Sequence, residues 1–247
     1  MRRILPLALS ALALCPLLPA QLAGQDQNTK LLPYQKAFSN LSAEKRRTFI
    51  KHHKEAQRLF GEKRIIEALE VLKFAEREFA DSPEMLNVRG SCYVELRAFD
   101  KALVCFNRAA ELSEGNYSVL FNIGEVHFVT QQWEKSHEAF ESLLKRLPED
   151  RVGIARISEF KLMLCKIKLG KKEEAMALAN KYDFLDDSPF HYFAKAVLAY
   201  EEEDLAEAGI WMARASRIFR NPAALAPWHD TMVEYGYIES FYGNDDQ

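Results

Sequence analysis

Residues 86–109 of this 247-residue chain read LNVRGSCYVELRAFDKALVCFNRA, and this stretch decides the fold. Apolar residues recur in it every three or four positions, as they do on one face of a helix, on both sides of a short polar turn. Gly90 and Ala102 are small where two antiparallel helices must approach closely, and Phe106 supplies the bulk that fills the space beside them. The stretch therefore predicts two helices packed against each other across a tight turn.

The same pattern returns with a period of 34 residues. One column of small residues contains Ala56, Gly90 and Gly124, and a second contains Ala68, Ala102 and Ser136. Two further columns contain Leu72, Phe106 and Phe140, and then Ala75, Ala109 and Leu143. One helix pair cannot bury its own hydrophobic face, so stacked copies are needed for stability. The columns predict three regular copies within residues 42–150, the first beginning near Ala43 with Ser42 as its N-cap.

Two looser copies are expected over residues 151–220. The fourth copy fits if about five residues, Arg151 to Ala155, are inserted after Pro148, and the fifth then follows at a spacing of 33. Residues 227–240 read as a final helix begun by Pro227. Its large side chains would cover the exposed end of the last copy, as terminal caps do in solenoids, and they are Trp228, Met232 and Tyr235.

These residues resemble the tetratricopeptide repeat (TPR), whose 34-residue pattern runs W-x₂-L-G-x₂-Y, then A-x₃-F, then P. The positions that match are Gly90, Tyr93, Ala102 and Phe106 in the second copy, and Gly124, Phe140 and Pro148 in the third. The departures are the absence of a Trp at the head of a repeat, Arg89 for Leu, His127 for Tyr and Ser136 for Ala. The resemblance covers about residues 49–220 and is strongest over 49–150.

The resemblance implies an all-α fold: a right-handed α-solenoid of stacked antiparallel helix pairs, with about five TPR-like repeats and a C-terminal capping helix. We expect the chain to divide into a signal peptide (1–23), a polar N-terminal lead (24–41), three regular repeats (42–150), two divergent repeats (151–220), and a capping helix with an acidic tail (221–247).

In the family that this chain resembles, the first helices of successive repeats line a concave groove that holds a peptide. Carried over repeat by repeat, the groove positions are His53, Gln57 and Phe60; Asn87, Ser91 and Val94; Phe121, Glu125 and Phe128; Phe160, Leu164 and Ile167; and Phe193, Val197 and Tyr200. The groove thus begins polar and becomes apolar and aromatic. Exposed apolar groups usually mark a binding site, which favours a protein or peptide partner with an apolar segment.

A competing interpretation is self-coverage, in which the cap helix or a second copy of the chain fills the groove. Some family members grip a C-terminal carboxylate with Lys, Arg and Asn in this groove. The matching places hold His53, Gln57 and Val88 here, so that activity is not expected. The groove also lacks the basic stripe with interleaved aromatics that nucleic-acid binding needs, so no nucleic-acid partner is expected.

No catalytic, metal or cofactor motif is present in the sequence, which predicts a protein that is not an enzyme. Gly170-Lys171 is not a phosphate-binding loop, because Cys165 stands where the first glycine of that motif belongs. His52 and His53 are adjacent, so they point to different helix faces and cannot chelate one metal ion together.

The beginning of the chain has the pattern of a secretory signal peptide. Arg2 and Arg3 precede an apolar run from Ile4 to Leu18, which is shorter than the ~20 residues needed to span a bilayer. A lipoprotein alternative centres on Cys15, although the bulky Leu14 departs from the usual lipobox. We expect a periplasmic or secreted protein with no transmembrane segment in the mature chain.

Charge and cysteine content leave further alternatives open. Residues 42–64 carry a net charge of +5 and residues 199–247 a net charge of −7, which could orient a charged partner or could simply be solvated helix faces. Cys92 and Cys105 fall on facing helices, where either a disulfide or two buried thiols would fit. The sequence gives no oligomeric state. For function it leaves two interpretations: an exported scaffold for protein–protein interaction, and a chaperone-like carrier that shields a hydrophobic segment of a secreted client.

Overall fold

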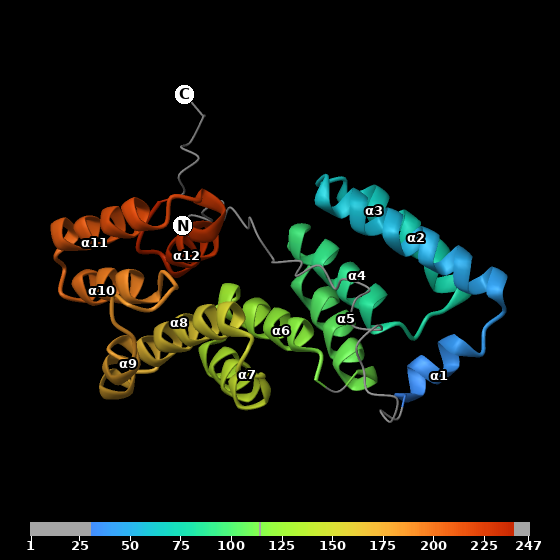
Figure 1. Cartoon of the computed structure of the whole chain (residues 1–247), viewed down its shortest axis with the longest axis horizontal. Coiled ribbons are helices and arrows are strands. Elements are labelled where there is room, and N and C mark those ends of the chain that lie inside the picture. Colours follow the sequence, from blue (N-terminus) through green and yellow to red (C-terminus); the bar gives the residue numbers. More distant parts are fainter. Residues whose placement is uncertain (1–30, 114, 240–247) are drawn as a thin grey trace, which may run out of the picture. The chain divides into compact units, whose positions relative to one another are not determined.

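The computed structural model describes residues 31–113 and 115–239, and over these residues every regular element is a helix (Figure 1). The helices are α1 (Pro33–Ser39), α2 (Ala43–Gly61), α3 (Ile65–Glu78), α4 (Pro83–Glu95), α5 (Phe99–Leu112), α6 (Tyr117–Val129), α7 (Trp133–Arg146), α8 (Val152–Lys168), α9 (Lys172–Ala179), α10 (Phe190–Glu201), α11 (Leu205–Ile218) and α12 (Pro222–Tyr235). They form two compact units, an N-terminal unit of residues 31–126 and a C-terminal unit of residues 127–239. The expected signal peptide lies outside the described residues.

In the N-terminal unit, α2 pairs with α3, α4 pairs with α5, and α3 packs on α4. The predicted start of α2 is confirmed, because the Ser42 hydroxyl accepts a hydrogen bond from the Lys45 amide at 3.2 Å. The close approach at Gly90 is also confirmed. A Cβ added to Gly90 would lie 2.7 Å from Cδ1 of Phe106, which is itself fully buried.

A short helix, α1, stands where a polar lead was expected. Pro33 occupies its first turn, where the missing N–H of proline costs nothing. The ring of Phe38 lies 5.3 Å from the rings of both Phe49 in α2 and Phe79 at the end of α3. This aromatic cluster closes the first end of the helix stack, and it explains why α1 is ordered although most of its residues are polar.

The turns between paired helices repeat with the period found in the sequence. Each contains one residue with positive φ, and these residues are Lys63, Arg97, Gln131, Gly170 and Glu203. Their spacings are 34, 34, 39 and 33 residues. In each turn the next residue donates a backbone hydrogen bond of 2.8–2.9 Å to the carbonyl five positions before it, as in Schellman caps. These spacings match the expected five copies and the five-residue slip after the third, and they place Gly170 in the turn between α8 and α9.

Two helices of the C-terminal unit depart from the regular lengths. α8 has 17 residues where α4 and α6 have 13, so the insertion after Pro148 lengthens a helix rather than a loop. α9 has 8 residues where α3, α5, α7 and α11 have 14, and a loop over residues 180–189 takes the place of its last turns.

The final helix begins five residues earlier than expected. α12 starts at Pro222, with the Asn221 side chain accepting a hydrogen bond from the Ala223 amide at 3.0 Å, and Pro227 lies inside the helix. Pro222 and Pro227 both fit the usual place of proline in a first helical turn, so the sequence pattern does not decide between the two starts. Thr231 donates its hydroxyl to the Pro227 carbonyl at 2.7 Å, one turn further on.

Candidate partner-binding surface

The groove positions of the N-terminal unit lie on α2, α4 and α6 and include several polar groups. The Asn122 amide donates a hydrogen bond of 2.9 Å to Oδ1 of Asn87, which joins α6 to α4. Both residues are buried. This bond leaves the Nδ2 donor of Asn87 and the Oδ1 acceptor of Asn122 without a hydrogen-bond partner among the described residues. A donor and an acceptor side by side match the needs of a peptide backbone.

His53 adds a third polar group to this face. Its ring stacks on Phe49, with ring centres 5.8 Å apart, and its Nε2 is buried without a hydrogen-bond partner among the described residues. Burial lowers the pKa of His53, and the nearby carboxylate of Glu84 opposes that shift. Glu84 itself accepts hydrogen bonds from Ser82 at 2.8 Å and from Tyr34 of α1 at 3.4 Å. A neutral imidazole is therefore favoured at neutral pH, and it offers a hydrogen bond rather than a charge.

The remaining groove positions of this unit differ in exposure. Gln57 and Glu125 are partly exposed, whereas the buried ones are Phe60, Ser91, Val94 and Phe121. The polar character predicted for the first part of the groove therefore rests on His53, Gln57 and the Asn87–Asn122 pair. Asn122 was not among the predicted positions, because the family pattern places its neighbour Phe121 in the groove; only the structure shows that its amide reaches Asn87.

In the C-terminal unit, α12 covers the groove positions of α8 and α10. The Trp228 ring lies 5.2 Å from Phe160 of α8 and 5.7 Å from Phe193 of α10, measured between ring centres. At the other end of α12, the Tyr235 ring lies 6.4 Å from that of Phe128, and the Tyr235 hydroxyl donates to the Leu164 carbonyl at 3.3 Å.

This arrangement corrects the expectation of an exposed aromatic surface. The residues that are completely buried are Phe128, Phe160, Leu164, Phe193 and Val197, while Ile167 and Tyr200 are partly exposed. Tyr200 stacks on Tyr237, just after α12, at 4.9 Å. The cap was expected to cover the end of the last repeat, but it also lies across the first helices of the fourth and fifth copies. The aromatic side chains are therefore part of a core that includes α12.

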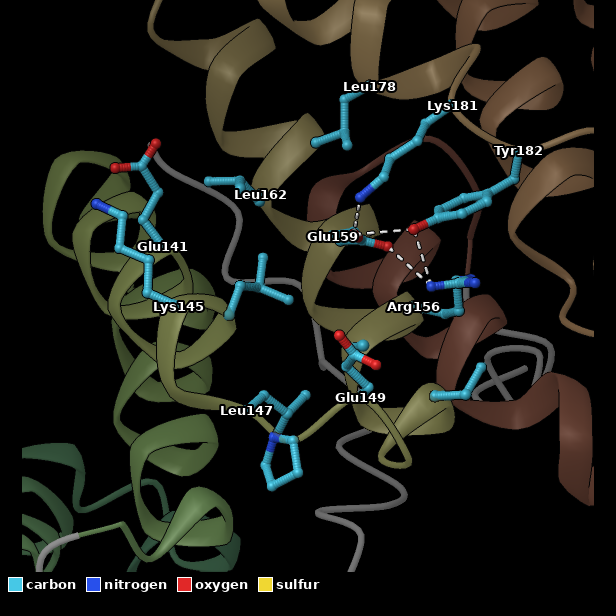
Figure 2. Close-up of a pocket in the computed structure, with 14 residues that line it drawn as sticks. Glu141, Lys145, Leu147, Glu149, Arg156, Glu159, Leu162, Leu178, Lys181 and Tyr182 are labelled. Carbon is cyan, nitrogen blue, oxygen red and sulfur yellow. Dashed lines mark hydrogen bonds and ion pairs between the residues drawn. The ribbon is translucent and has the colours of Figure 1, made fainter.

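A pocket of about 520 Å³ opens elsewhere in the C-terminal unit, between α7, α8, α9 and the loop that follows α9 (Figure 2). Along one wall, Arg156 donates to the Tyr182 hydroxyl at 2.8 Å and to Asp186 at 3.0 Å. Glu159, which is almost fully buried, accepts from Lys181 at 2.5 Å and from Tyr182 at 3.0 Å. Sequence reasoning missed this network, because its members come from one helix, α8, and an irregular loop with no periodic signal.

Over the described residues, no group of three or more His, Cys, Asp or Glu is placed to hold a metal ion. Cys92 and Cys105 are buried thiols with no disulfide between them, and burial raises the pKa of Cys92 to about 12. None of the helices described is long and apolar enough to cross a membrane.

Comparison with known proteins gives relatives of part of the sequence. No protein-family model matches the chain. It is 25% identical over 168 residues to the peptidyl-prolyl cis-trans isomerase FKBP4 of Bos taurus, covering 65% of this chain and 35% of the relative. The human FKBP4 is 25% identical over 154 residues, covering 60% and 32% respectively. The chain thus spans about a third of the length of these curated relatives.

Solved structures resemble the chain over more of its length. YrrB, described as a TPR protein with an unusual peptide-binding site, superposes with a TM-score of 0.53 at 16% identity, covering 80% of this chain and 96% of YrrB. The pilF protein of Pseudomonas aeruginosa gives 0.56 at 13% identity, covering 78% and 96%. A TPR protein from Parabacteroides merdae gives 0.54 at 17% identity, covering 81% and 75%. Together with the repeated turns and helix pairs, these likenesses show that the chain has a TPR-like fold.

Proposed function

We propose that this chain is an exported, non-catalytic scaffold that binds a segment of another protein on the first-helix faces of its N-terminal unit. The observation that carries this proposal is the Asn87–Asn122 pair, whose hydrogen bond leaves one further amide donor and one amide acceptor for a ligand, together with the unpartnered Nε2 of His53 at the equivalent place in the preceding copy. Buried polar groups are normally paired, so the enclosed Nε2 of His53 favours a ligand that supplies its partner. The second amide groups of Asn87 and Asn122 are not enclosed in the same way, so a ligand can reach them as well.

The partner that fits this face is a peptide segment held mainly through its backbone. Asn87 can donate to a peptide carbonyl, and Asn122 can accept from a peptide N–H. Phe60 and Phe121 are buried in the same unit, so hydrogen bonds rather than apolar contacts would dominate the recognition of the partner. YrrB, whose fold is similar, is described as having a peptide-binding site, which supports the class of partner.

The C-terminal unit supports a chaperone-like carrier less well. A carrier that shields a hydrophobic segment needs open apolar positions, and in this unit the side chains of Trp228 and Tyr235 already occupy them. A carrier would have to displace α12 together with the nearly buried ion pair between Lys161 and Glu234. We therefore place the scaffold first.

Export is the second part of the proposal, and it rests on residues 1–23 of the sequence alone. The two arginines followed by an apolar run of 15 residues have the order and length of a Sec-type signal. Sequencing the N-terminus of the protein isolated from its host tests this point. A chain that begins near residue 24 agrees with export, and a chain that retains Met1 contradicts it.

The binding surface can be tested by affinity capture from the native host with paired variants. Leucine is close to asparagine in size, so Asn87→Leu/Asn122→Leu removes both amides and keeps the packing. The matched control is Asn107→Leu, at an exposed position of α5. Two lost hydrogen bonds at about 1 kcal/mol each weaken binding by more than about tenfold. A partner that the double variant loses and the control retains supports the proposal, whereas a partner retained by both places binding on another surface.

A further inference from the structure

The pocket of the C-terminal unit lies where the two irregular helices meet. Val152 and Ala155 come from the inserted residues at the start of α8, Arg156 follows them, and Leu178 comes from the end of the short α9. In a regular repeat the last turns of the second helix would fill this space. The pocket is thus a consequence of the shortened α9, and its volume of about 520 Å³ lies within the range of ligand-binding pockets.

The lining of the pocket is apolar in the middle and charged at its sides. Figure 2 shows Leu147, Leu162 and Leu178 between two walls, with Lys145 on the α7 side and Lys181 on the opposite side. The acidic groups at the rim are Glu141, which lies 3.7 Å from Lys166, and the exposed Glu149. Lys145 makes no ion pair with any described residue, so its charge is available to a partner.

The loop beside this pocket is held rigidly at its base. Arg156 bonds both Tyr182 and Asp186, and the side chain of Asp186 also accepts from the Ser188 amide at 3.0 Å. Within the loop, the Asp183 carboxylate accepts from the Leu185 amide at 2.9 Å. These bonds fix the residues on both sides of Phe184 and Leu185, so the pair is presented outward in a defined conformation.

Phe184 and Leu185 are adjacent large apolar residues left in solvent. Their exposed fractions are 66% and 75%, and neither lines the pocket of its own chain. Asp183 and Asp187 flank the pair, so the loop tip consists of two apolar side chains with a negative charge on each side.

We propose that the Phe184–Leu185 loop of one copy inserts into the α7–α8–α9 pocket of a second copy of this chain. The apolar pair fits the leucine floor, and the negative charge of the flanking Asp183 and Asp187 fits Lys145, whereas Lys181 already pairs with Glu159 at 2.5 Å. Loop and pocket adjoin each other on the same unit. In a two-fold symmetric dimer, the loop of each copy would therefore insert into the pocket of the other copy, so that the same contact is made twice, as in an isologous interface.

Sedimentation velocity of the purified chain tests this contact at concentrations up to about 100 μM, where a weak dimer is populated. We expect the wild type to dimerise, and Phe184→Asp/Leu185→Asp to raise the dissociation constant by more than about tenfold, since it places charge on the leucine floor. The matched control is Leu205→Asp, which changes an apolar residue of similar exposure, 68%, at the start of α11 and should leave dimerisation unchanged.

A complementation experiment separates this contact from other modes of association. Leu147→Asp should block the pocket, and Lys145→Glu is a second, exposed pocket variant if circular dichroism shows that the first is unfolded. Each variant alone should be monomeric. An equimolar mixture of loop and pocket variants should recover part of the dimer, because it retains one intact loop and one intact pocket. A monomeric wild type, a dimer insensitive to the loop variant, or no recovery on mixing would each overturn the proposal.

Discussion

Lys161 of α8 and Glu234 of α12 form an ion pair of 2.8 Å whose side chains are only 3% and 5% exposed. The Lys161 ammonium also lies 4.4 Å from the centre of the Phe128 ring. The two charges join the final helix to the first helix of the fourth copy, inside the C-terminal unit. A buried pair of this kind favours one position of α12 on α8, because a shift of the helix would separate the Glu234 carboxylate from the Lys161 ammonium.

Removing one partner of this pair should be costly. Glu234→Leu removes the carboxylate that pairs with the buried Lys161 ammonium at 2.8 Å, and we expect the free energy of unfolding to fall by about 3 kcal/mol. Lys161→Met/Glu234→Leu removes both charges and should recover most of that loss. All three tryptophans, Trp133, Trp211 and Trp228, lie in the C-terminal unit, so urea unfolding followed by tryptophan fluorescence reports on it. Equal losses in the single and double variants would show that the pair is not the source of the effect.

The contact between Gly90 and Phe106 predicts opposite effects of the same substitution at two glycines. Gly90→Ala places a Cβ about 2.7 Å from Cδ1 of Phe106 and should destabilise the chain by about 1–3 kcal/mol through overpacking. Gly209→Ala, inside α11, meets no atom within 4 Å and should stabilise it by about 0.5–1 kcal/mol, because alanine is the better helix former. Thermal unfolding followed by circular dichroism measures both. A neutral Gly90→Ala would mean that Phe106 can move aside freely.

The left-handed turns predict a second pair of opposite effects. Arg97 adopts φ 56° and Gly170 adopts φ 73° at equivalent places in two copies. Because a side chain is disfavoured in this region, Arg97→Gly should stabilise the turn and Gly170→Ala should destabilise it, each by about 1 kcal/mol. Chemical denaturation curves of the two variants and the wild type provide the comparison. Effects of the same sign in both would contradict the shared turn geometry.

Buried histidines predict a loss of stability on mild acidification. Burial lowers the pKa of His53, His127, His137 and His229. Below about pH 6.5 the unfolded chain takes up protons that the folded chain does not, so stability is full above that value and falls towards the lowered folded pKa. Urea midpoints at about pH 7.5 and about pH 5.5 should therefore differ. His53→Gln should reduce the difference, and a difference of unchanged size would exclude His53 as a contributor.

The local features of the fold could be predicted from the sequence. These features depend on residues that lie within one 34-residue copy: the apolar periodicity, the small residues at helix contacts and the Ser42 cap. The helix pairs, their register and the five-residue slip were therefore predictable. The polar part of the candidate site followed from the same register, since His53 and Asn87 stand at equivalent positions of adjacent copies.

The tertiary structure decided what the sequence pattern could not. The sequence around Trp228 and Tyr235 does not indicate which surface these side chains cover. Their contacts are with residues far away in the sequence, namely Phe160, Phe193 and Phe128. Those contacts turned an expected open aromatic groove into a core. The Asn87–Asn122 bond and the pocket beside the shortened α9 likewise depend on side chains from different helices. Helical repeats are set by short-range periodicity, whereas coverage of their faces depends on which distant segment packs there, and periodicity does not encode that.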